Sequence, residues 1–118
     1  MTQPPSVVVV IMSGVDDGTT LDCSQENGDG RLEGQRWTLQ IGRREDSDIC
    51  LRHDLFVSRQ HACIYWEDDR WWLHDLGSTN GTFIENQDGD TRVSGTIPLP
   101  PGALFRVGRT WLRIEPAN

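Results

Sequence analysis

The chain has 118 residues and a formal net charge of −7, from 11 Lys and Arg against 18 Asp and Glu. This length suits one domain with a modest core, and the acidic balance excludes a general nucleic-acid or anionic-membrane surface. Any bound anion must therefore meet a local cluster of Arg.

Cysteine usage and hydropathy indicate a cytoplasmic protein. Cys23, Cys50 and Cys63 are odd in number, widely spaced and lack zinc-ligand spacing, which is typical of reduced thiols. The one strongly apolar run, residues 7–12, is far shorter than the ~20 residues of a membrane helix. No basic stretch of the kind that opens a secretory signal precedes it. We therefore expect no membrane contact.

In the first half of the chain, the pattern predicts short strands. Residues 7–12 are nearly all β-branched and predict a buried strand. Residues 16–35 are rich in Asp, Gly, Asn and Thr, which predicts a strand fragment near Thr20 followed by a loose excursion. Residues 36–41 alternate between polar and apolar types, as a half-buried strand does, and this strand should end at Gly42.

The second half repeats the pattern, with a turn at residues 67–70 and a tight hairpin turn at Gly108-Arg109. Further strands are expected at residues 49–51, 62–66, 71–76, 83–84, 93–99, 104–107 and 110–114. No long segment shows a helical period. About nine to eleven short strands with regular turns predict an all-β, antiparallel-rich β-sandwich.

Five Trp residues raise the question of a base-stacking surface. Their alternating strand positions favour core packing instead, and the acidic charge disfavours RNA. Trp71 and Trp72 are adjacent, so they must face opposite sides of a strand. We expect one of them to be partly exposed.

Three strand-end segments carry more polarity than a turn requires. The first is Gly42-Arg43-Arg44 with Ser47-Asp48, the second is residues 57–61, and the third is residues 77–82, G-S-T-N-G-T. In the third, Asn80-Gly81 predicts a type I′ turn with positive φ at both positions. If the sheets bring the segments to one end, they assemble guanidinium, hydroxyl and amide donors that suit a dianionic phosphate.

The order of these motifs resembles the forkhead-associated (FHA) domain family. The matching residues are Gly42-Arg43, then Ser58-x-x-His61, then the loop at residues 76–82. The resemblance runs from about Leu39 to Ile114. It implies an eleven-stranded β-sandwich, one domain over residues 1–118 with an insertion at 16–35. It also implies binding of proteins or peptides in which a Ser/Thr kinase has phosphorylated a threonine. No cofactor or metal is expected.

The resemblance also implies roles for single residues. Arg43 resembles the Arg that contacts phosphate, and Ser58 the hydroxyl that bonds to it. Thr79 and Asn80 match loop positions that reach the phosphate pocket and the peptide backbone, and Arg59 offers a second charge.

Four more residues complete the expected site. Ser78, which precedes Thr79, is expected to face the peptide. Gly42, His61 and Gly81 are expected to support the loops without touching the ligand, Gly81 through positive φ. One departure from the family pattern is the longer segment at 87–90, which leaves peptide specificity open. An effector domain beyond Asn118 is a further expectation, since such domains are commonly parts of longer chains.

Other residues raise the alternatives of catalysis, calcium binding, dinucleotide binding and phosphate-independent docking. A catalytic triad from Ser58 or Ser78, His61 or His74, and Asp54 or Asp75 lacks the G-x-S-x-G elbow, so we predict no enzyme. Asp88 and Asp90 lack the rest of a calcium loop, and the glycines at 28–34 lack a following helix for a dinucleotide. The main alternative is a phosphate-independent or autoinhibitory docking domain that uses a sheet face or residues 16–35.

Overall fold

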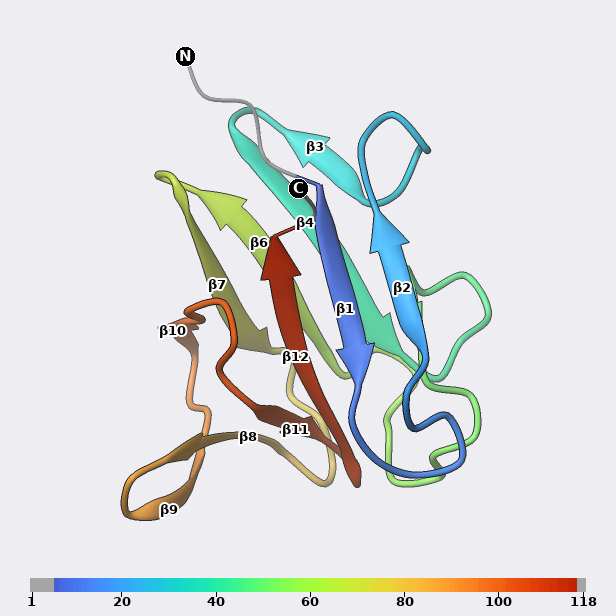
Figure 1. Ribbon diagram of the computed structural model, residues 1–118, viewed down its shortest axis with the longest axis vertical. Coiled ribbons are helices and arrows are strands. Elements are labelled where there is room, and N and C mark those ends of the chain that lie inside the picture. Colours follow the sequence, from blue (N-terminus) through green and yellow to red (C-terminus); the bar gives the residue numbers. More distant parts are fainter. Residues whose placement is uncertain (1–5, 117–118) are drawn as a thin grey trace.

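The computed structural model describes residues 6–116, which form two packed β-sheets without a helix. The all-β sandwich predicted from the sequence is confirmed (Figure 1). Within the described part of the chain, no helix is therefore long and apolar enough to cross a membrane. The twelve strands are β1 (Val7–Ile11), β2 (Thr20–Cys23), β3 (Arg31–Glu33), β4 (Arg36–Gly42), β5 (Ile49–Cys50), β6 (Ala62–Glu67), β7 (Arg70–Asp75), β8 (Thr82–Asn86), β9 (Gly89–Arg92), β10 (Thr96–Pro98), β11 (Phe105–Val107) and β12 (Thr110–Pro116).

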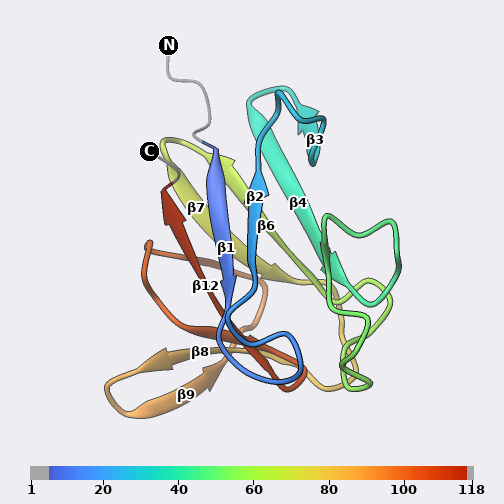
Figure 2. The same ribbon diagram turned by 45° about the vertical axis from the view of Figure 1, so that its right-hand side comes forward.

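The two sheets have separate strand orders. The first sheet runs β2-β1-β12-β11-β8-β9, and the second runs β10-β7-β6-β4-β3, with β5 paired to β4. Every pairing is antiparallel except that of β4 with β5. The chain changes sheet four times, between β2 and β3, β7 and β8, β9 and β10, and β10 and β11. Several loops therefore cross from one sheet to the other at the ends of the sandwich (Figure 2).

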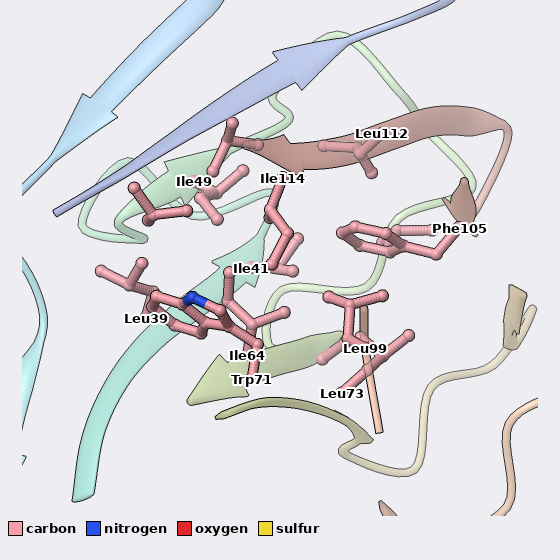
Figure 3. Close-up of a cluster of buried hydrophobic side chains, with 14 of the residues drawn as sticks. Leu39, Ile41, Ile49, Ile64, Trp71, Leu73, Leu99, Phe105, Leu112 and Ile114 are labelled. Carbon is pink, nitrogen blue, oxygen red and sulfur yellow. The ribbon is translucent and has the colours of Figure 1, made fainter. Parts of the chain in front are cut away.

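The core lies between the sheets, where alternate residues of each strand point inward. On β4, Trp37, Leu39 and Ile41 are almost fully buried, as their alternation predicts. Phe105 and Leu112 meet them from the other sheet (Figure 3). Burying such side chains contributes roughly 1.5–3 kcal/mol each, so this layer holds the loops in place.

Five aromatic residues make ring contacts in or beside the core near the β6–β7 turn. The Trp71 ring lies 5.8 Å from the Trp37 ring and 5.6 Å from the Trp66 ring. Trp72 faces the other way, is half-buried, and stacks on Tyr65 at 6.4 Å. The prediction that Trp71 and Trp72 face opposite sides is confirmed.

The three cysteines are free thiols. Burial raises the pKa of Cys23 to about 12 and that of Cys63 to about 11. Both therefore remain protonated at neutral pH. Cys50 is half-buried at the edge of the second sheet.

The segment at residues 16–35 is more ordered than its composition predicts. The strand near Thr20 is confirmed as β2, but the expectation of a loose excursion after it is wrong, because β3 pairs with β4. Two hydrogen bonds hold the residues just before β3 in place. The Asp48 carboxylate accepts a bond from the Gly30 amide at 2.9 Å, and the Trp37 indole donates to the Asp29 carbonyl at 2.9 Å.

The strand predicted at residues 93–99 is confirmed in part as the shorter β10, but β9, which precedes it, was not predicted. The chain pairs with β8 as β9, leaves the first sheet after Arg92, and joins the second sheet as β10. Gly95, with φ of 70°, lies in the crossing. The residues of β9 are all exposed and none is apolar, so the local pattern gives no strand signal there.

The turns correct one prediction and confirm another. The β6–β7 turn places both Asp68 and Asp69 at positive φ, 57° and 60°, as a type I′ turn requires. Asn80 does not have positive φ, although Gly81 does at 86°. The hairpin predicted at Asn80-Gly81 is therefore wrong, because β7 and β8 lie in different sheets. The tight Gly108-Arg109 hairpin turn is confirmed between β11 and β12.

Candidate binding site

Three loops gather at one end of the sandwich, on the right and lower right of Figure 2. They are residues 43–48 after β4, residues 51–61 after β5, and residues 76–81 after β7. Backbone bonds join them: the Arg43 amide donates to the Ser58 carbonyl at 3.1 Å, and the Leu76 amide donates to the His61 carbonyl at 2.9 Å. The end of each strand therefore fixes the start of each loop.

His61 links two of these loops from inside. Its side chain is fully buried. Nδ1 accepts a bond from the Ser58 amide at 2.9 Å, and Nε2 lies 2.8 Å from the Gly81 carbonyl. A carbonyl accepts only, so Nε2 carries the proton and the ring is neutral. Burial lowers the pKa of His61 below 6.5. His61 thus supports the loops and does not reach the surface.

Gly42 lets the first two loops approach each other closely. A Cβ at Gly42 would lie 2.0 Å from the Arg59 carbonyl oxygen and 3.1 Å from the Ser47 hydroxyl. No side chain fits in that space. Gly42 thus brings the end of β4 next to the segment that carries Ser58 and Arg59.

Asp54 fixes the loop before Ser58, a role that the sequence did not indicate. Its carboxylate accepts bonds from the Phe56 amide at 2.9 Å, the Arg109 amide at 2.8 Å and the Thr110 hydroxyl at 2.6 Å. The loop is thereby tied to the β11–β12 hairpin. Asp54 and Arg109 are 55 residues apart, so no local signal identifies the pair.

Asp75 organises the third loop in the same way. It accepts bonds from the Ser78 hydroxyl and the Thr82 hydroxyl, both at 2.7 Å, and from the Gly77 amide at 3.0 Å. Burial raises the pKa of Asp75, but these hydrogen bonds outweigh it and hold the pKa below 3.8. The Ser78 hydroxyl also accepts the Gly81 amide at 3.0 Å. Ser78 is therefore turned inward.

The loops enclose a surface pocket of about 330 Å³. Its lining residues are Arg43, Leu55, Phe56, Val57, Ser58, Arg59, Thr79 and Asn80. The predicted contact residues Arg43, Ser58, Arg59, Thr79 and Asn80 are thus brought together. Ser78 is not among them. Gly42, His61 and Gly81 lie behind or beside the pocket.

The pocket presents free donors. Within residues 6–116, neither the Arg43 nor the Arg59 guanidinium has a hydrogen-bond or ion-pair partner. The Ser58 hydroxyl accepts the Thr79 amide at 3.3 Å, so its own proton remains available. The Asn80 amide nitrogen donates to the Phe56 carbonyl at 2.9 Å and spans the loops. Two cations and one hydroxyl suit an anion with several acceptor oxygens.

An apolar pocket of about 280 Å³ adjoins this site and shares Leu55 and Phe56 with it. Val15 and Leu55, at 83% and 78% exposure, are the most exposed large hydrophobic residues of the described chain. The Arg109 guanidinium lies 3.8 Å from the centre of the Phe56 ring and holds it at the rim. The sequence pattern did not indicate this pocket, since Val15 and Phe56 are far apart in the chain.

Fold and site together define a β-sandwich that presents a cationic pocket on loops at one end. Comparison with known families agrees, because the FHA domain family matches residues 39–108, more than half of the chain. The chain belongs to the FHA domain family.

Two curated relatives and one solved structure show the extent of the likeness. FHA domain-containing protein FhaB of Mycolicibacterium smegmatis is 36% identical over 93 residues, which cover 75% of this chain and 57% of FhaB. Oxoglutarate dehydrogenase inhibitor of Corynebacterium jeikeium is 32% identical over 104 residues, 88% of this chain and 60% of that protein. The solved structure comes from a study of phosphothreonine-dependent FHA domain interactions. It has a TM-score of 0.70 and 28% identity, covering 96% of this chain and 98% of its own. This chain thus spans little more than half of these curated relatives.

Proposed function

We propose that this domain binds phosphothreonine-containing peptides and recruits or regulates a phosphorylated partner. The observation that carries the proposal is the pocket that Arg43 and Arg59, two unpaired guanidiniums, line together with Ser58. A structural neighbour that was solved for its phosphothreonine-dependent interactions supports the same ligand. Arg clusters are a recurring means of reading phosphate in peptides.

The geometry suggests a role for each residue. Arg43 and Arg59 neutralise the phosphate, and Ser58 donates a hydrogen bond to it. Asn80 keeps its side-chain carbonyl free, because its amide nitrogen is used in the bond to Phe56, and this carbonyl accepts a peptide backbone N–H. Ser78 receives a positioning role in place of the expected contact, since its hydroxyl is bonded to Asp75.

Thr79 gives the pocket a methyl-bearing side chain beside the two guanidiniums. Burial of the threonine methyl there favours phosphothreonine over phosphoserine by roughly 1 kcal/mol, about fivefold in affinity. Loss of the phosphate removes two or three charge-assisted bonds at ~1.5–3 kcal/mol each. Unphosphorylated peptide should therefore bind far more weakly than either.

A degenerate phosphothreonine peptide library tests the proposal by fluorescence anisotropy. The same library without phosphate and with phosphoserine serves as the comparison. Wild type is measured beside Arg43→Ala and the control Arg44→Ala. The Arg44→Ala substitution removes the same charge as Arg43→Ala. Arg44, however, pairs with Asp46 at 3.0 Å and does not line the pocket. We expect phosphothreonine binding in wild type and Arg44→Ala, and none in Arg43→Ala.

The second candidate is phosphate-independent docking onto a larger enzyme. One relative is named as an inhibitor of oxoglutarate dehydrogenase, which keeps this alternative open for the whole protein. Binding that ignores phosphate and survives Arg43→Ala would support it and overturn the phosphothreonine proposal.

The remaining expectations belong to the same proposal. The domain acts as a binding module without catalysis or a cofactor, and its likeness to binding-domain structures supports this. A cytoplasmic location agrees with three free thiols. We propose that residues 1–118 form a single FHA domain that acts as a regulatory module.

A further inference from the structure

An unpaired Arg outside the pocket lies directly against the loop that carries Asn80. A Cβ at Gly81 would lie 3.1 Å from Nε and 3.2 Å from Cζ of Arg92. The Arg92 guanidinium therefore covers the backbone one residue beyond Asn80. Arg92 is exposed, and within residues 6–116 its guanidinium has no hydrogen-bond or ion-pair partner.

The sheet next to Arg92 carries a second cation. Arg92 is directly opposite Phe83 on β8, and Phe83 is directly opposite Arg106 on β11. The Arg106 guanidinium lies 4.2 Å from the centre of the Phe83 ring and 5.7 Å from that of Trp111. It also donates to the Gly108 carbonyl at 2.7 Å. Arg106 is thus held in place, whereas Arg92 is free to meet a ligand.

The charges around Arg92 limit where a ligand can lie. Glu85 and Asp90 are directly opposite each other, two positions farther toward the tip of the β8–β9 hairpin. Their carboxylates repel an anion from the tip. An anionic ligand of Arg92 is therefore kept on the loop side, next to Gly81 and Asn80.

We propose that Arg92 is a specificity-determining residue that binds a second anionic side chain of the same peptide. The proposal rests on the proposed phosphothreonine function. An extended peptide advances about 3.3 Å per residue, so a carboxylate or second phosphate a few residues from the phosphothreonine reaches Arg92. The domain carries a net charge of −7, so acidic peptides are disfavoured elsewhere on its surface.

The test uses phosphothreonine libraries in which Asp is fixed at one position, from about three residues before to four after the phosphothreonine. Anisotropy is measured for wild type, Arg92→Gln and the control Arg113→Gln. Arg113 lies on the same sheet, paired with Glu115 at 2.7 Å. We expect one Asp position to raise wild-type affinity about threefold. Arg92→Gln should lose this gain and keep its affinity for the unfixed library, and Arg113→Gln should keep both.

Four further results decide between the outcomes. Arg92→Glu should prefer Lys over Asp at the same position, which guards against a variant that is merely misfolded. Phosphoserine at that position separates the two anions, because a larger gain than with Asp assigns a second phosphate and an equal gain assigns a carboxylate. No favoured Asp position in wild type, or a gain that survives Arg92→Gln, would overturn the proposal. If wild type fails to bind the unfixed phosphothreonine library, the proposed function itself fails.

Discussion

Gly42 shows how one missing Cβ shapes the pocket. Alanine at this position would place its Cβ 2.0 Å from the Arg59 carbonyl oxygen, and backbone must move to relieve the clash. We expect Gly42→Ala to destabilise the fold by about 1–3 kcal/mol and to weaken phosphothreonine binding, because the Arg59 segment shifts. Urea unfolding and anisotropy measure the two effects.

Gly28 provides the control for this substitution. It has φ of 83°, and a Cβ added there would have no neighbour within 4 Å. Gly28→Ala should cost only about 1 kcal/mol of backbone strain and leave peptide binding unchanged. Equal effects of the two substitutions on binding would contradict the steric account of Gly42.

His61 makes the stability of the fold depend on pH. Its pKa is lowered below 6.5 by burial, so the unfolded chain takes up a proton at higher pH than the folded chain does. The stability from neutral His61 is fully present above about pH 6.5. It declines as pH falls from there toward the folded pKa. Urea midpoints between about pH 7.5 and 5.5 should fall in wild type and change less in His61→Gln.

His53 is the comparison for this titration. It is exposed and pairs with Asp16 at 3.0 Å. His53→Gln should retain most of the fall in urea midpoint. A flat wild-type profile over the same pH range would contradict the assignment to His61.

At the scale of elements, the β6–β7 turn is built from unfavourable residues. Asp68 and Asp69 both have positive φ, where Asn-Gly is preferred. We expect the double substitution D68N/D69G to stabilise the fold by about 1 kcal/mol and to raise Tm by about 4 °C. Calorimetry measures this. Asp88→Asn is the control, because it removes a charge from another hairpin without relieving a positive φ. It should raise Tm much less than D68N/D69G does. Equal rises in Tm would show that the lost charge is the cause.

The sequence pattern predicts single strands but not which strands share a sheet. The alternation around Leu39 correctly predicts a half-buried strand, because inward and outward positions are a local property. Local pattern does not show that β7 and β8 lie in different sheets, so it wrongly favours a hairpin at Asn80-Gly81. Nor does it indicate the roles of Asp54 and Asp75, because an acidic residue in a turn gives no sign of its distant partners.

The candidate site is more predictable than its supports. The family resemblance points to Arg43, Ser58, Arg59, Thr79 and Asn80, and all five line one pocket. It does not show that Ser78 turns inward, since a loop serine has the same pattern in either orientation. Nor does it indicate Phe56 and Val15, because their exposure depends on packing between distant loops.

At the scale of the whole molecule, ligand binding should stabilise the fold by mass action. At about 100 times Kd, a phosphothreonine peptide contributes about 2.7 kcal/mol, which corresponds to a Tm rise of about 10 °C for a chain of this size. Differential scanning fluorimetry of wild type with and without peptide measures the rise. Arg43→Ala should show none, and the unphosphorylated peptide should leave wild type unchanged. A rise in Arg43→Ala would contradict the assigned pocket.

The pairing of β1 with β12 determines how the domain can be joined to other chains. Val7 is opposite Pro116, so β1 starts beside the end of β12, while the loops that line the proposed peptide pocket lie at the other end of the sandwich (Figure 1). A fusion partner joined directly before β1 or directly after β12 would therefore start from the end of the sandwich away from the pocket. The domain suits use as a transplantable sensor head, with its reporter placed where it does not obstruct the ligand.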